Sequence, residues 1–175
     1  MPSLSDRMMR AARLEPALYE EVEHDEAALG QAMTVVVLAS VASGIGSLQA
    51  GGFGGLVLGT LGALVGWFVW AFLAYFIGVR VVPEPETKAD IGQLLRTTGF
   101  SASPGIIRAL GIIPGLGPLF MLAGSVWMLV AMVIAVRQAL DYRSTGRALG
   151  VCILGWLVQV AILLVLVSLV GAPQT

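Results

Sequence analysis

The residue with the clearest potential for chemistry is Arg108, which lies in an otherwise apolar part of the sequence. A guanidinium at membrane depth is costly unless it reaches an interface, meets water or finds a partner. None of the predicted membrane-crossing segments contains Asp or Glu, so its partner would be a carbonyl, a hydroxyl, the amide of Gln159 or a lipid phosphate. Two interpretations stay open: Arg108 and Gln159 are functional or lipid-contacting residues, or the segment lies shallow and Arg108 extends to the headgroups.

We predict no catalytic residue, no metal ligand and no cofactor. His24 is the single histidine and Cys152 the single cysteine, so neither has the second ligand or the base that a metal site or an activated nucleophile needs. We expect His24 to be exposed and Cys152 to be a small buried hydrophobe. The sequence therefore predicts a protein that is not an enzyme, and the lack of intramembrane carboxylates argues against a proton or cation pump.

The composition indicates which elements must position Arg108. The chain has 175 residues, of which 57% are hydrophobic and 12% charged, and its mean hydropathy is +0.89. Such values are far from those of soluble domains and are typical of an all-α, polytopic membrane protein. Ten basic and eleven acidic residues nearly cancel, so we expect no nucleic-acid partner.

The first 31 residues predict a cytoplasmic amphipathic segment. Leu14, Leu18 and Val22 recur at every fourth position, and acidic residues fill most places around them, which predicts a short amphipathic helix over 14–28. The acidic face is either simply solvated or able to dock a basic partner.

Residues 32–171 predict a membrane domain of five crossings, followed by a tail at 172–175. The predicted crossings are 32–48, 56–79, 94–113, 119–136 and 149–170. The glycine-rich stretch 49–55 is interpreted as a flexible hairpin loop between the first two. The third crossing is short or irregular, because it contains several hydroxyl residues, Pro104 and Arg108.

The third crossing is supported by length and by charge. A single helix over 105–136 would be about 48 Å long, against a hydrocarbon core of about 30 Å, so the Pro-Gly-Leu-Gly-Pro sequence at 114–118 is interpreted as a hairpin turn. With five crossings, nine of the ten basic residues lie on one side, as cytoplasmic segments require. The sequence thus predicts a multi-pass protein of the cell membrane with a cytoplasmic N-terminus and an external C-terminus.

Small residues predict how the second crossing packs. Gly55 with Gly59, and Gly62 with Gly66, form two small-xxx-small pairs, a pattern that lets helix backbones approach closely in lipid. They serve either the bundle itself or a homo-oligomer. Trp67 and Trp127 fall near the middle of their segments, and each is expected to pack against another helix.

The order of these features resembles the Yip family, named for interaction with Ypt/Rab GTPases. The resemblance is carried by Gly99-Phe100, Pro104, Ile113-Pro114-Gly115-Leu116-Gly117, Trp127 and the segment 143–148. It implies a non-enzymatic, five-span membrane protein, whose eukaryotic relatives act in vesicle traffic with small GTPases and in membrane shaping. The short N-terminal segment and the preference for Arg over Lys indicate a prokaryotic member, so we carry over fold and topology but not the GTPase partner.

Two functions fit these observations. The first is a scaffold or membrane-organising, trafficking-type protein that binds membrane lipids, other membrane proteins or a second copy of itself. The alternative is a small transporter or channel subunit, because broken helices beside a buried charge recur at transport sites. An enzyme that acts on lipids is a more distant third hypothesis.

Overall fold

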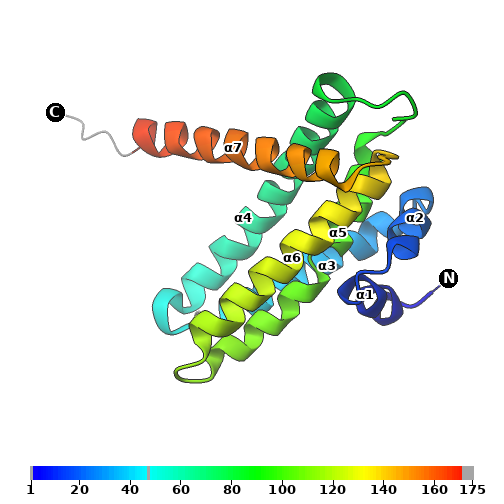
Figure 1. Ribbon diagram of the computed structural model, residues 1–175. Helices are drawn as coiled ribbons and strands as arrows, with labels where there is room; N and C mark the ends of the chain where they lie inside the picture. Colours follow the sequence, from blue (N-terminus) through cyan, green and yellow to red (C-terminus); the bar gives the residue numbers. More distant parts are fainter. Residues whose placement is uncertain (1, 47, 171–175) are drawn as a thin grey trace.

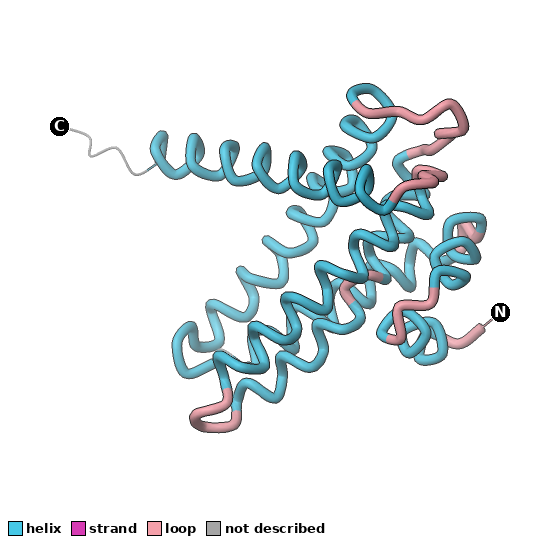
Figure 2. The backbone as a smooth tube through the Cα atoms, in the orientation of Figure 1, coloured by secondary structure: helices cyan, strands magenta, loops and turns pink. Residues whose placement is uncertain are grey.

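The protein is a bundle of helices. The computed structural model describes residues 2–46 and 48–170, without the side chains of 48–53, 55, 56, 163, 166, 167, 169 and 170. The described residues form seven α-helices, a π-helix and a 3-10 helix, with no strand among them (Figure 2). In chain order these are α1 (Leu4–Ala12), α2 (Pro16–His24), α3 (Ala28–Gly46), α4 (Leu48–Phe76), η1 (Ile77–Val81), α5 (Ile91–Phe100), η2 (Ser103–Ile112), α6 (Gly117–Ala139) and α7 (Thr145–Val170). The all-helical prediction is therefore confirmed.

Four stretches of the described residues are long and apolar enough to cross a membrane. They are Ala28–Gly46, Val57–Val81, Gly117–Ala139 and Thr145–Ile162, and they correspond to the first, second, fourth and fifth predicted crossings. In Figure 1, α7 contacts the bundle near its start and then projects away from it. Along its length α7 exposes apolar side chains such as Trp156, which is 60% exposed.

The third predicted crossing consists of α5 followed by η2. A capping box starts α5, with the Asp90 carboxylate accepting from the Gln93 backbone N–H and the Gln93 side chain accepting from that of Asp90. Pro104, which has no N–H to donate, lies at the start of η2, and the chain continues as a 3-10 helix to the turn at Gly115, where φ is +80°. η2 then packs between α3 and α6.

Glycines on the third segment and its neighbours make the close contacts of this bundle. A Cβ added at Gly99 would lie 2.7 Å from the Cβ of Ala32, and one added at Gly105 would lie 2.6 Å from the sulfur of Met128. Ala32 cannot move out of the way without its backbone, so Gly99 requires glycine, whereas the flexible Met128 side chain would have to shift to admit a Cβ at Gly105.

The prediction of a glycine-rich loop at 49–55 is wrong, because α4 already begins at Leu48. Lipid offers no water to satisfy backbone N–H and C=O groups, so helical pairing outweighs the conformational freedom of glycine there. α4 then continues directly into η1, where the Tyr142 hydroxyl lies 3.0 Å from the Gly78 carbonyl oxygen and 2.6 Å from that of Val82.

The N-terminal segment contains two short helices where one was predicted over 14–28. Ser3 caps α1 by accepting from the Asp6 backbone N–H. Leu14 adopts a left-handed φ of 62°, which breaks the helix before Pro16 begins α2. α2 ends at His24, and α3 begins at Ala28, four residues before the predicted start of the first crossing. The predicted tail at 172–175 lies outside the described residues.

Candidate functional site

A cavity of about 380 Å³ lies among the helices and contains the residue that the sequence singled out. Its walls come from α3, α4, α5, η2 and α6, and include Ser40, Gly59, Gly66, Trp67, Arg108 and Met128. Among the described residues that line it, none is Asp or Glu. The cavity is therefore largely apolar, with hydroxyl groups and one guanidinium on its walls.

One aromatic side chain in the cavity wall is held in place by a hydrogen bond. Trp67 is 6% exposed, and its Nε1 donates to the Thr98 hydroxyl at 3.2 Å. The Thr98 hydroxyl in turn donates to the Leu94 carbonyl, so this polar chain is satisfied within the protein. The prediction that Trp67 packs against another helix is confirmed.

Arg108 occupies another part of the wall, where its side chain crosses α6 at a glycine. A Cβ added at Gly124 would lie 2.7 Å from Cγ of Arg108. Beyond it, Nη2 of Arg108 donates to the Ser125 hydroxyl at 2.7 Å, which donates to the Met121 carbonyl at 2.7 Å. Nε of Arg108 is buried and has no partner among the described residues. A guanidinium has five N–H donors, so most of its bonding capacity faces no described protein acceptor.

Gln159 does not supply the missing acceptor in this structure. Its amide nitrogen lies 3.8 Å from the position of a Cβ added at Gly66, and no described hydrogen bond joins it to Arg108. The functional role of Gln159 stays a prediction.

The glycines of α4 form an open wall. A Cβ added at Gly59 or at Gly62 would meet no atom within 4 Å, and Gly59 and Gly66 line the cavity. The side-chain surroundings of Gly55 lie outside the described residues. The helix-packing role of the four glycines stays a prediction, and a second copy of the chain is the partner that would fit it.

A second cluster, formed by residues that sequence reasoning did not single out, attaches α1 and α2 to the rest of the molecule. Arg7 is 2% exposed. Its guanidinium contacts the carboxylates of Glu21 and Asp25 at 2.9 and 2.6 Å and donates to the Gln31 side chain at 3.0 Å. This arginine thus ties α1, α2 and α3 together.

Arg96 of α5 completes the attachment. Its guanidinium donates to the Val22 carbonyl at 2.9 Å and to that of Glu23, two of the carbonyls that α2 leaves unpaired at its C-terminal end. The Glu23 side chain is 3% exposed and accepts from the Gln93 amide at 3.1 Å through one oxygen, while the other has no described partner. Burial, followed by the charges of Asp141 and Glu20, raises the pKa of Glu23 to about 7.

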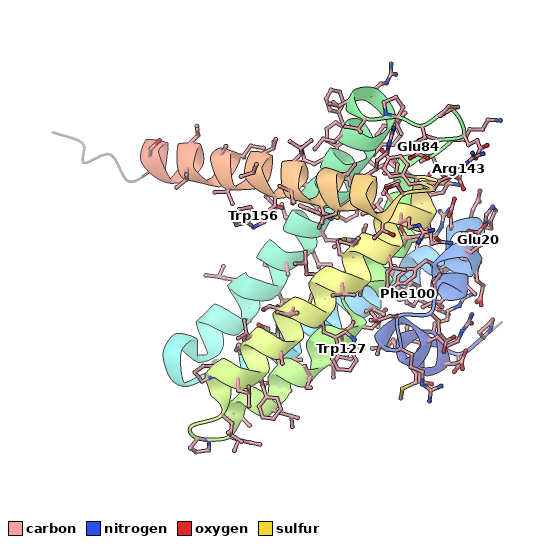
Figure 3. All side chains as sticks on the ribbon, viewed as in Figure 1. Glu20, Glu84, Phe100, Trp127, Arg143 and Trp156 are labelled. Atoms are coloured by element: carbon pink, nitrogen blue, oxygen red, sulfur yellow. The ribbon has the colours of Figure 1, made fainter. Side chains whose placement is uncertain are left out.

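Three further contacts join segments that are distant in the sequence. The indole Nε1 of Trp127 donates to the Ala12 carbonyl at 2.9 Å, so this tryptophan packs against α1 (Figure 3). Arg143 and Arg147 pair with Glu86 and Glu84 of the loop after η1. His24 is exposed and Cys152 is buried, as predicted.

Sequence spacing could have indicated one part of the Arg7 cluster. Glu21 and Asp25 are four residues apart, a spacing that places two carboxylates on one side of a helix. The cations that they and the end of α2 meet lie far away along the chain: Arg7 is 14 residues from Glu21, and Arg96 is 73 residues from Glu23. No local signal marks such pairs.

These features define the class first: an all-helical integral membrane protein with a cavity among its apolar helices. The chain belongs to the Yip1 domain family, whose model matches residues 17–167. Neither the comparison with curated proteins nor that with solved structures returned a match.

Proposed function

We propose that this protein crosses the cell membrane five times, with its N-terminus in the cytoplasm, and organises the membrane by binding lipids and other membrane proteins rather than by catalysis. The third crossing, which brings the total from the four long apolar helices to five, is α5 with η2. Their inclusion keeps nine of the ten basic residues on the cytoplasmic side.

The observation that carries the scaffold role is the attachment of α1 and α2 to the membrane helices. Arg7 and Arg96 are both buried and join these helices to α3 and α5. The cytoplasmic segment is therefore a fixed surface, and it exposes the acidic side chains of Glu20 and Glu26. A rigid, acidic surface suits a basic protein partner, because the ordering cost of binding is already met.

The test is purification from native membranes in mild nonionic detergent. We compare the wild type with a Glu20→Gln/Glu26→Gln double variant, using Glu86→Gln as a control that removes one acid from the exposed loop after η1. A protein that co-elutes in stoichiometric amounts with the wild type and the control, and is depleted with the double variant, supports the scaffold role. Equal recovery with all three proteins, or no stoichiometric protein with any of them, contradicts it.

The cavity favours the second candidate function, a small transporter or channel subunit. A space of about 380 Å³ beside a cation is within the range of sites that hold small solutes. Ionic current across planar bilayers in potassium chloride would support this function if Gly59→Leu, which adds bulk to the cavity wall, abolished the current. Bilayers that stay silent with the wild-type protein contradict it as a channel.

A further inference from the structure

Arg108 is a cation without a described counter-charge. The membrane helices contain no Asp or Glu, and none lines the cavity among the described residues. Its one described acceptor is the neutral Ser125 hydroxyl, while the buried Nε has none. A cation in an apolar surround is stable only when a fixed dipole or an anion compensates it, so an anion from outside the chain fits this position.

The position of Arg108 along η2 brings it within reach of lipid headgroups. Ile112, the last residue of η2 before the turn, lies four positions after Arg108. At about 2.0 Å per residue in a 3-10 helix, this is about 8 Å of helix axis. An arginine side chain and a locally thinned bilayer together span such a distance.

The remaining walls suit a hydrocarbon chain. Gly59, Ala63 and Gly66 give α4 a low-relief wall, and Trp67, Met128 and Met132 supply apolar contact area. A volume of about 380 Å³ is too small to enclose a whole phospholipid, but it accommodates a headgroup with the first part of one chain.

We propose that this cavity binds an anionic phospholipid, with the lipid phosphate on Arg108 and one acyl chain along the α4 wall beside Gly59 and Gly66. A phosphate has several acceptor oxygens and matches the fork of guanidinium donors, which gives acceptors to the Nη hydrogens that the Ser125 hydroxyl does not take. The Ser125 hydroxyl accepts from Nη2 and so holds the guanidinium in place. The proposal rests on lipid binding in the proposed function and names the lipid class and its site.

The first experiment measures thermal unfolding of the full chain in nonionic detergent. Phosphatidylglycerol, phosphatidylcholine and inorganic phosphate are added separately to the wild type, to Arg108→Gln and to Arg80→Gln. Arg80 is an exposed arginine at the end of the second crossing, so it controls for the loss of one positive charge. We expect phosphatidylglycerol to stabilise the wild type and Arg80→Gln, and its apparent affinity to fall roughly ten- to hundredfold in Arg108→Gln, as for one lost charged hydrogen-bond partner.

The second experiment tests the chain-binding wall and does not depend on whether Arg108→Gln folds. Gly59→Leu and Gly62→Leu make the same change on α4, and a Cβ is free of contacts at both, but only Gly59 lines the cavity. Native mass spectrometry should find the lipid retained by the wild type and Gly62→Leu and lost from Gly59→Leu.

Three results would overturn the proposal. One is an undiminished response of Arg108→Gln to phosphatidylglycerol, and another is equal lipid retention by the two leucine variants. The third is full stabilisation by inorganic phosphate alone, which would assign Arg108 to a free anion. The protein co-elution assay does not involve Arg108 or Gly59, so the scaffold role fails or survives independently of these results.

Discussion

Arg7 is the residue whose loss should disrupt the N-terminal helices α1 and α2 most. Removing it leaves Asp25 without its cation and Glu21 with Arg10 alone, and frees α1 from the Gln31 side chain of α3. We expect Arg7→Met to lower the free energy of unfolding by about 3 kcal/mol, near the lower end for a broken buried ion pair, because both carboxylates stay partly exposed. Limited proteolysis within residues 4–24 should accelerate in parallel. Arg13→Met, which alters an exposed arginine just after α1, is the control; equal behaviour of the two variants would refute this role.

Glu23 should make stability depend on pH. Its pKa is about 7 in the folded protein, above the ordinary 4.5, so between these values the folded state binds more protons than the unfolded state. The contribution of Glu23 to stability is therefore fully present below about pH 4.5, and it is lost as the pH rises through about 7. Thermal unfolding midpoints measured from pH 5 to 8 should decline for the wild type and decline less for Glu23→Gln. Parallel curves for the two proteins would show that Glu23 does not titrate there.

At the scale of elements, Gly99 and Gly62 should respond oppositely to the same substitution. Gly99→Ala places a methyl group against Ala32 and should destabilise the bundle by about 1 to 3 kcal/mol, as overpacked sites do. Gly62→Ala meets nothing within 4 Å and should be neutral or stabilising by up to about 1 kcal/mol, since alanine favours helix. Thermal unfolding in detergent measures both. A loss of stability at Gly62 together with a change in oligomeric mass would instead place this glycine against a second copy.

The sequence predicts the positions of the long apolar helices, but it does not predict the short helix α1 or the helical start of α4. Runs free of charge require helices wherever lipid surrounds them, so four of the predicted crossings reappear with shifted ends. The helix over 49–55 was missed because glycine suggests loops in water, whereas lipid forces backbone pairing. α1 was missed because its stability comes from Arg7 and Trp127, and those contacts are tertiary.

For the whole molecule, the number of crossings can be tested by labelling. In a Cys152→Ser background, single cysteines at Leu116, Lys88 and Ser144 occupy exposed positions in three connecting segments. Five crossings with a cytoplasmic N-terminus predict that an impermeant thiol reagent labels only the Leu116 position in intact cells, and all three after permeabilisation. Labelling at Ser144 from outside would remove the crossing by α5 and η2.

The sequence predicts the central residue of the candidate site but not the residues around it. Arg108 is identifiable from the sequence because burying a charged side chain within an apolar segment costs free energy. Its neighbours Ser125 and Gly124 follow from the way the η2–α6 hairpin closes, which depends on the turn at Gly115 and on the 3-10 geometry of η2. Gln159 was the reasonable guess among polar residues, but α7 leaves the bundle and brings it to Gly66 instead.

The attachment of α1 and α2 also has a consequence for the order of events during synthesis. The Ala12 carbonyl accepts its hydrogen bond from Trp127, which is synthesised 115 residues later. The hydrogen bond between Glu20 and Gln138 likewise spans 118 residues. At 5 to 20 residues per second, the first of these intervals is roughly 6 to 23 s. α1 and α2 thus leave the ribosome well before the residues that hold them, and they reach their final places only after α6 has been synthesised. During that interval the pairs of Arg7 with Glu21 and Asp25 can already form. α1 and α2 can therefore form a helical hairpin before they dock on the membrane helices.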